Sequence, residues 1–238
     1  MMRKIGYLLS CALMFASCAS QYNIAGNSTV GSLDGNMLYL RVAENDGSNL
    51  NNVDSCQVVH GRFKFIGDID SVVVAHLYMG NESMMPVVLE NGDLAIEVNN
   101  SCQRVSGGPL NDKLYSFIEL KTRMENELWE LDQQCLRMMR EGRTIKDIHN
   151  LIGPKSKKLS NQIEGLETQF IIDNYENPLG PACFMLLFGQ YPVPVMTDQI
   201  HKIVDSAPGS FLNHPIVNNY LKQAQVNSHN EANQNAFK

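Results

Sequence analysis

The first half of the chain alternates short apolar runs with polar clusters that contain glycine, asparagine or aspartate. The runs are rich in Val, Ile, Tyr and Phe, which fit the pleated surface of a sheet. The clearest runs are Met37–Val42, Val58–Ile66, Val72–Met79, Pro86–Glu90 and Leu94–Val98. Gly and Asn tolerate positive φ, and they supply turn signals at Asp34-Gly35-Asn36, His60-Gly61 and Asn91-Gly92. Together these features predict an antiparallel β-sandwich-like domain.

One of these runs shows the alternation of a strand with a single buried face. Phe63 and Phe65 alternate with Arg62 and Lys64, and Gly61 lets the preceding turn close. We therefore expect the two phenylalanines to lie in the core of the sandwich.

The spacing of apolar residues changes after Gly107-Gly108-Pro109, a segment that we interpret as a linker. Beyond it they recur every three or four residues, as on one face of an amphipathic helix. This stripe consists of Leu110, Leu114, Phe117, Leu120, Met124, Leu128, Leu131, Cys135 and Met138. Gly142 is expected to end the helix and Thr144 to cap a second one. The stripe of the second helix, Leu159, Ile163, Leu166 and Phe170, completes a predicted antiparallel hairpin.

Shorter helical segments are predicted after Asn177-Pro178. The segment 180–189 is nearly all apolar and is expected to be buried, 197–206 begins with the capping residue Thr197, and 215–223 is amphipathic. From about Val226 the chain is almost entirely polar, so burial cannot offset the entropy of ordering it, and we expect a disordered tail.

The N-terminus has the pattern of an export signal. Arg3 and Lys4 precede the apolar stretch 5–15, which is too short to span a bilayer. Residues 14–18 resemble a bacterial lipobox, in which the cysteine, here Cys18, takes diacylglycerol and becomes the N-terminus. Phe15 stands where lipoboxes usually have Leu, Val or Ile, so a soluble periplasmic product cut after Ala19 is the alternative. With lipidation, several acyl chains would hold the protein in a membrane.

The sequence therefore predicts an α+β protein of the Gram-negative cell envelope. Its expected parts are a lipoprotein signal peptide over 1–17, a β-sandwich-like domain over 18–109, a helical domain over 110–225 and a polar tail over 226–238. The segment after Cys18 has no acidic run, which favours an anchor facing the periplasm, in either the outer or the inner membrane. The net charge of −6, without any dense cluster of Lys and Arg, argues against nucleic acid as a partner.

Four cysteines follow Cys18. Cys56 and Cys102 both belong to the predicted β domain, and they are the candidate pair for a disulfide in an oxidising periplasm. Cys135 lies in the apolar helix stripe and Cys183 in an apolar run, so we interpret both as small core residues. The alternative for all four is that they remain free thiols.

The other reactive side chains show no spacing that chemistry requires. The six histidines lack metal-ligand spacing, and Glu125, Glu127 and Glu130 fit the solvated face of the first predicted helix. The cluster Lys155, Lys157 and Lys158 fits either lipid head groups or ordinary soluble surface. We therefore predict no catalytic, cofactor or metal site, while the sequence leaves the identity of any small-molecule ligand open.

Several motifs in the first half resemble a known domain of unknown function. They are Tyr22-Asn23-Ile24-Ala25-Gly26, Leu33-Asp34-Gly35 with Leu38-Tyr39-Leu40, Val53-Asp54-Ser55 with the stretch 60–67, and 88–92 with Val105-Ser106-Gly107. This domain begins many bacterial envelope lipoproteins of the thiol-disulfide interchange type, where helices and a thioredoxin-like domain follow. The resemblance implies an opening strand at 22–26, a first hairpin around Leu33-Asp34-Gly35, and no catalytic residues.

The chain contains no Cys-x-x-Cys, so it lacks the attacking and resolving thiols of a thioredoxin. Our leading hypothesis is a non-catalytic, lipid-anchored envelope protein that serves as a binding or interaction module. The rival is an accessory of a separate thioredoxin-like thiol-disulfide interchange protein, and a third interpretation is an enzyme with a novel site.

Overall fold

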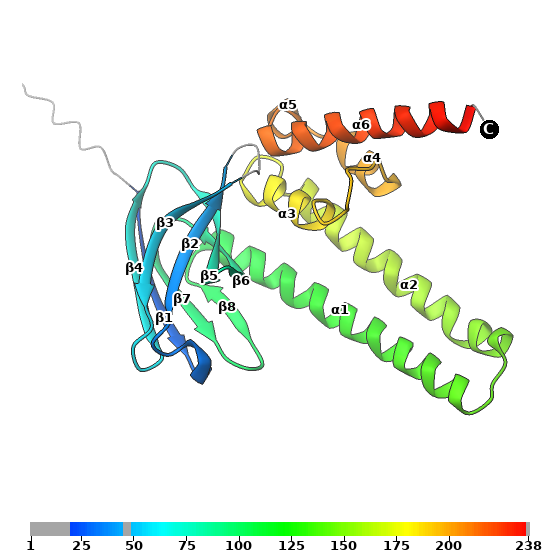
Figure 1. Cartoon of the computed structure of the whole chain (residues 1–238), viewed down its shortest axis with the longest axis horizontal. Coiled ribbons are helices and arrows are strands. Elements are labelled where there is room, and N and C mark those ends of the chain that lie inside the picture. Colours follow the sequence, from blue (N-terminus) through cyan, green and yellow to red (C-terminus); the bar gives the residue numbers. More distant parts are fainter. Residues whose placement is uncertain (1–19, 45–48, 237–238) are drawn as a thin grey trace, which may run out of the picture.

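The computed structural model describes residues 20–44 and 49–236, and its first part consists of β-strands (Figure 1). These strands are β1 Ser20–Ser28, β2 Met37–Ala43, β3 Leu50–Gln57, β4 Arg62–Ile69, β5 Val73–Met79, β6 Glu82–Leu89, β7 Gly92–Val98 and β8 Gln103–Ser106. A short 3-10 helix, η1 Gly31–Leu33, lies between β1 and β2.

The strands form two packed sheets, so the predicted sandwich is confirmed. One sheet has the order β4-β1-β7-β8 and the other β3-β2-β5-β6. β1 and β2 lie in different sheets, and the segment around Leu33 is a crossover between them, not the first hairpin that the resemblance implies. The β3–β4 connection turns at His60 and Gly61, both with positive φ, as the turn signal predicts.

The alternation of side chains explains how each sheet buries one face. Phe63 and Phe65 of β4 are buried while Arg62, Lys64 and Ile66 are exposed, which confirms the expected strand pattern. Gly26 of β1 lies under the ring of Phe63, where a Cβ atom would come within 2.0 Å of the ring. Small and large residues therefore interlock in the core of the sandwich.

One pair of strands departs from the predicted antiparallel arrangement. β1 runs antiparallel to β4 but parallel to β7, with Ile24 opposite Leu94. The chain leaves the sheet of β1 and returns to it much later, so local turn signals carry no information about this pairing.

The second part of the chain is helical, as predicted. The helices are α1 Pro109–Arg140, α2 Ile145–Ile172, α3 Leu179–Phe188, α4 Asp198–Val204, α5 Gly209–Leu212 and α6 Pro215–Ala236. Gly142 adopts a φ of +80° just after α1, and the Thr144 side chain accepts a hydrogen bond from the Asp147 N–H at the start of α2. Thr197 caps α4 in the same way. All three helix boundaries follow from local chemistry.

The C-terminal segment differs from the disordered tail that we predicted. Helix α6 continues from Pro215 to Ala236, and so includes most of this segment. Asn227 donates a hydrogen bond to the Pro194 carbonyl, 2.8 Å away, and Ala224 one turn earlier is fully buried. These tertiary contacts hold α6 against the loop before α4, and composition alone does not reveal them.

Two hydrophobic cores meet at the junction of the sandwich and the helices. Tyr115 of α1 is buried in the sandwich core, and its hydroxyl donates to the Pro86 carbonyl at 2.8 Å. In the opposite direction, Val88 of β6 is part of the helical core. The sandwich and the helical part therefore each contribute a buried side chain to the core of the other.

Candidate functional site

The start of α1 is fixed to the sandwich by a buried polar network. Glu90 is only 4% exposed and Asn111 is fully buried. The Glu90 carboxylate accepts hydrogen bonds from the backbone N–H groups of Leu110 and Asn111, at 3.2 and 2.9 Å, and from the Asn111 side chain at 2.9 Å. Asn111 in turn bonds both backbone groups of Val88. A negative carboxylate at a helix N-terminus also complements the helix dipole.

This network contradicts our interpretation of Gly107-Gly108-Pro109 as a linker. Gly107 has a φ of +98°, and a Cβ atom on Gly108 would lie 2.2 Å from the Glu90 carboxylate. The glycines allow the strand and the helix to approach closely enough for Glu90 to bond the free N–H groups of α1. The junction is therefore tight, and it sets the direction of α1.

Helices α1 and α2 extend from this junction as an antiparallel hairpin that projects from the sandwich (Figure 1). Near the body the two helices pack closely, with the rings of Phe117 and Phe170 stacked at 4.1 Å between centroids. Lys121 of α1 pairs with Glu125 and also, at 3.3 Å, with Glu167 of α2. Partial burial lowers the pKa of Lys121, but the two carboxylates outweigh this effect and raise its pKa overall.

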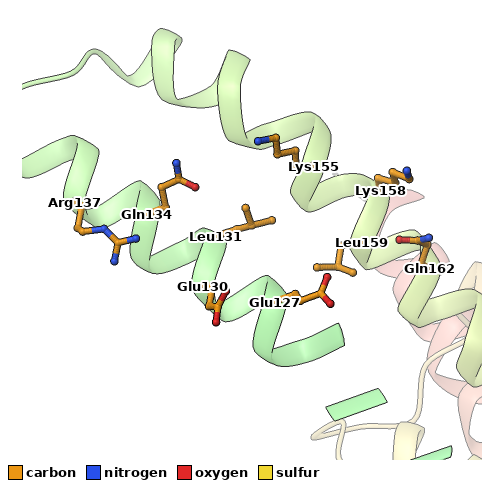
Figure 2. A pocket seen from close by; sticks show the side chains of 9 residues that line it. All are labelled: Glu127, Glu130, Leu131, Gln134, Arg137, Lys155, Lys158, Leu159 and Gln162. Carbon is orange, nitrogen blue, oxygen red and sulfur yellow. The ribbon is translucent and has the colours of Figure 1, made fainter. Parts of the chain in front are cut away.

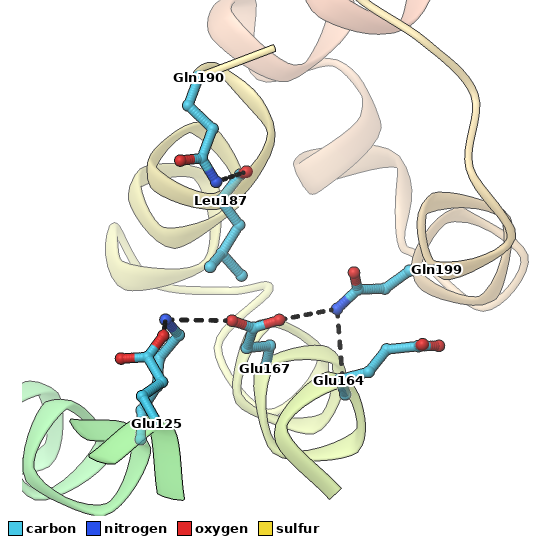
Figure 3. A network of polar contacts seen from close by, with 7 residues as sticks. Glu125, Glu164, Glu167, Leu187, Gln190 and Gln199 are labelled. Atoms are coloured by element: carbon cyan, nitrogen blue, oxygen red, sulfur yellow. Dashed lines mark hydrogen bonds and ion pairs between the residues drawn. The ribbon is translucent and has the colours of Figure 1, made fainter. Parts of the chain in front are cut away.

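The same polar cluster ties the hairpin to α4. The Gln199 side chain donates to the Glu167 carboxylate at 3.2 Å and to the Glu164 backbone carbonyl at 3.3 Å (Figure 3). The base of the hairpin is thus held by aromatic packing, ion pairs and hydrogen bonds, so its outer part has a defined position relative to the body.

We define the arm as the outer part of this hairpin, residues 120–140 of α1 and 145–162 of α2. Along the arm the predicted apolar stripe of α1 is poorly covered: Leu120 is exposed, and Met124, Leu128, Leu131, Cys135 and Met138 are only half-buried. A groove of about 460 Å³ lies between the two helices. Its lining consists of Glu127, Glu130, Leu131, Gln134, Arg137, Lys155, Lys158, Leu159 and Gln162 (Figure 2).

Large apolar side chains also lie exposed elsewhere on the arm. Trp129 is 61% exposed and Ile145 at the start of α2 is 79% exposed. Leu136, Met139 and Leu151 are about half exposed as well. Trp129 lies one residue off the apolar stripe, so the 3.6-residue period could have indicated its outward position. An accumulation of exposed apolar residues is typical of a surface that binds another molecule.

Except for Arg137 of α1, the charged side chains that line the groove are acidic on α1 and basic on α2. Glu127 and Glu130 of α1 lie on one rim, and Lys155 and Lys158 of α2 lie on the other (Figure 2). All four are exposed, which agrees with the solvated face predicted for the glutamates. Within the described residues none of the four takes part in an ion pair.

A second polar feature lies on the outer face of the sheet β3-β2-β5-β6. The Arg41 guanidinium lies over the rings of Tyr39 and Tyr78, at 5.0 and 4.8 Å from their centroids, and its Nε donates to Asn52 at 2.8 Å. These cation–π contacts hold the guanidinium over the two tyrosine rings. His76 on β5 faces Arg41 across the strand pair and lies 3.2 Å from the Ser83 hydroxyl.

We expect His76 to make the folded protein less stable at mildly acidic pH. Burial lowers its pKa below the ordinary value of 6.5. The folded protein therefore binds this proton less readily than the unfolded chain, so the stabilisation is present above pH 6.5 and is lost as the pH falls below it. His214 carries a pKa shift of the same direction and cause. We expect urea midpoints at pH 7.5 and pH 5.5 to differ less in His76→Gln than in the wild type, and an unchanged difference would contradict this role of His76.

The structure does not make the predicted disulfide between Cys56 and Cys102. Both are free thiols, as are Cys135 and Cys183. Cys56 lies on β3, which packs beside β4, whereas Cys102 precedes β8 at the other edge of the sheet that contains β4. Shared membership of one domain therefore does not bring the two thiols together.

The buried thiols are poor nucleophiles. Burial raises the pKa of Cys56 to about 11, with a further contribution from Asp54, and burial alone raises the pKa of Cys183 to about 12. Cys183 is buried in the helical core, as predicted, while Cys135 is half-buried on the arm. A protonated thiol neither attacks disulfides nor binds metals well.

Other predicted features have the following positions. Cys18, the lipidation candidate, lies outside the described residues. Among the residues that the structure describes, no three His, Cys, Asp or Glu side chains are grouped as a metal ion requires. None of the helices in this part of the chain combines the length and the apolar character needed to cross a bilayer.

The fold thus defines an α+β protein with a two-sheet sandwich and a projecting helical hairpin. Residues 22–114 match a family model described as a domain of unknown function, DUF4369. The match covers the sandwich, the junction and the first turns of α1. No curated protein and no solved structure matches the chain.

Proposed function

We propose that this protein is a non-catalytic, lipid-anchored component of the cell envelope that binds a protein partner through its arm. The observation that carries the proposal is the exposure of Trp129 and its apolar neighbours on a hairpin whose base is fixed to the body. Tryptophan is over-represented among residues that dominate binding energy, and a pre-positioned surface loses little entropy on binding.

The lipobox at Cys18 supports the anchored location. Strand β1 begins at Ser20, only two residues further on. Two residues span at most about 7 Å, so an acylated Cys18 would hold the sandwich directly at the lipid head groups. The arm, which projects from the sandwich, would then be presented at a defined height above the membrane.

We expect the double variant Trp129→Ser, Leu136→Ser to lose its partner. The matched control is Val59→Ser, Ile66→Ser, which removes two comparably exposed apolar side chains from the sandwich. After crosslinking in intact cells and purification from membranes, recovery of the partner should fall at least about 30-fold for the arm variant, as expected for a hot-spot tryptophan. Equal recovery from both variants would refute binding through the arm.

A second candidate is an accessory role beside a thioredoxin-like thiol-disulfide interchange protein. It is favoured by the motifs of the first half, which resemble a domain that precedes thioredoxin-like domains in envelope lipoproteins. The family model that matches residues 22–114 supports a domain of unknown function. In the same purification, this role predicts that the partner lost from the arm variant contains a Cys-x-x-Cys thioredoxin-like domain. A set of partners without one would exclude the accessory role.

A further inference from the structure

The groove of the arm carries opposite charges on its two rims, and this asymmetry restricts what it can bind. The α1 rim carries Glu127 and Glu130, with Arg137 further toward the tip, while the α2 rim is basic through Lys155 and Lys158. The opposite charges therefore face each other at the level of the two glutamates. An acidic peptide would satisfy only the α2 rim, and a basic peptide only the α1 rim. A ligand that satisfies both must itself present an acidic row beside a basic row.

The register of the hairpin places these charges at the same height. Two contacts at the base, Phe117 with Phe170 and Lys121 with Glu167, define which residues of the antiparallel helices are level. Both helices rise about 1.5 Å per residue, so the same register continues outward and sets Glu130 level with Lys158. Figure 2 shows both side chains on the groove, with Leu131 and Leu159 between the helices.

We propose that the groove face of the arm binds the groove face of a second copy of this chain. A two-fold axis parallel to the helices would lay α1 of each copy against α2 of the other, because such an axis exchanges the two sides of the hairpin. Glu130 of each copy then lies level with Lys158 of the other, so the charged pair forms twice. Leu131 and Leu159 of the two copies become covered in the middle. The inference rests on the proposed binding role of the arm and assigns an occupant to its groove face, whose lining does not include Trp129 or Leu136.

The size of the arm determines how strong this dimer is. About 20 residues of each helix give a length of about 30 Å, and two helices about 10 Å wide give a face of about 600 Å². Two such faces bury about 1,200 Å² in total, the lower end of specific interfaces. The dimer is therefore reversible in dilute solution, and it is favoured on a membrane, where the anchor would concentrate the chains.

Charge reversal on one rim at a time provides the test. The acidic-rim variant is Glu127→Lys, Glu130→Lys, and the basic-rim variant is Lys155→Glu, Lys158→Glu. All four residues are exposed, so neither change disturbs the core. The matched control for the acidic-rim variant is Asp132→Lys, Glu141→Lys, which makes the same charge change at exposed positions that do not line the groove.

Sedimentation equilibrium of the full mature chain in detergent measures the dimer. We expect the wild type and the control variant to dimerise, and each rim variant to dimerise at least tenfold more weakly because its two rims carry like charge. An equimolar mixture of the two rim variants restores opposite charges at every contact, so it should form a heterodimer at least as well as the wild type.

Three results would overturn the dimer, and they affect the proposed function differently. A chain that stays monomeric while Trp129→Ser, Leu136→Ser still loses a captured envelope protein would remove self-association and leave arm-mediated binding standing. A chain that stays monomeric and captures nothing through the arm would remove both. Dimerisation that is equal in the wild type and both rim variants would show that another surface associates.

Discussion

Replacing Glu90 by alanine is expected to lower the free energy of unfolding by about 2–4 kcal/mol. The substitution removes a buried carboxylate that accepts hydrogen bonds from the Leu110 and Asn111 backbone and from the Asn111 side chain. These donors would stay buried without partners, and the favourable charge at the start of α1 would be lost as well. Urea unfolding followed by circular dichroism measures the effect.

The control for this prediction is Glu97→Ala, which removes an exposed carboxylate from strand β7. It should change the unfolding free energy by less than about 0.5 kcal/mol. Similar losses in both variants would show that Glu90 does not hold the junction. Glu90→Gln keeps an acceptor without the charge, so an intermediate loss would separate hydrogen bonding from the helix dipole.

Replacing Phe184 by alanine is expected to cost about 3–5 kcal/mol and to destabilise the sandwich together with the helices. Phe184 is fully buried in the helical core, where its ring contacts those of Phe188, Phe211 and Tyr220 at centroid distances of 4.9–5.9 Å. Tyr115 of α1 lies in the sandwich core, and Val88 of β6 lies in the helical core. The loss of stability in the helices should therefore extend to the sandwich.

Calorimetry and hydrogen exchange test this coupling. We expect one cooperative thermal transition, lowered by on the order of 10 °C in Phe184→Ala, and faster exchange of amides in β1 as well as in α3. The control is Leu186→Ala on the same helix, because Leu186 is 51% exposed. Two separate transitions, with the sandwich unaffected, would mean that the two parts unfold independently.

Both predictions concern the arm as well as stability. If the junction and the helical core are rigid, the arm is held in one orientation relative to the sandwich. A partner that binds the arm then does not have to pay the entropy of ordering the arm. Variants that loosen the junction should therefore weaken arm-mediated binding even though they leave Trp129 and the groove unchanged.

Local sequence chemistry accounts for most of the element boundaries. The apolar stripes from Leu110 and from Leu159 predicted the helical hairpin, and Gly142, Thr144 and Thr197 marked helix ends through conformations and capping bonds that need no distant partner. The clearest strand runs were found in the same way. Strands β1, β3 and β8 were not among them: β1 was expected only from the family resemblance, β3 is mostly polar and exposed, and β8 is short.

The candidate site was predictable only in part. The pattern indicated a hairpin with acidic residues on its solvated face, but the groove depends on how closely α1 and α2 approach along the arm. The pairing of Cys56 with Cys102 was wrong because sandwich topology separates their strands. The expected linker at Gly107-Gly108-Pro109 was also wrong, since its glycines admit a carboxylate that lies far away in the sequence.

The sequence by itself determined the division into a β half and a helical half, the end of α1, the starts of α2 and α4, and the buried face of β4, because periodicity and capping act over a few neighbouring residues. Only the tertiary structure decided the parallel pairing of β1 with β7, the burial of Glu90 against Asn111, the extension of α6 and the groove between α1 and α2. Each of these depends on which distant segment comes to lie nearby, and the free energy of such contacts belongs to the pair of segments and not to either one alone.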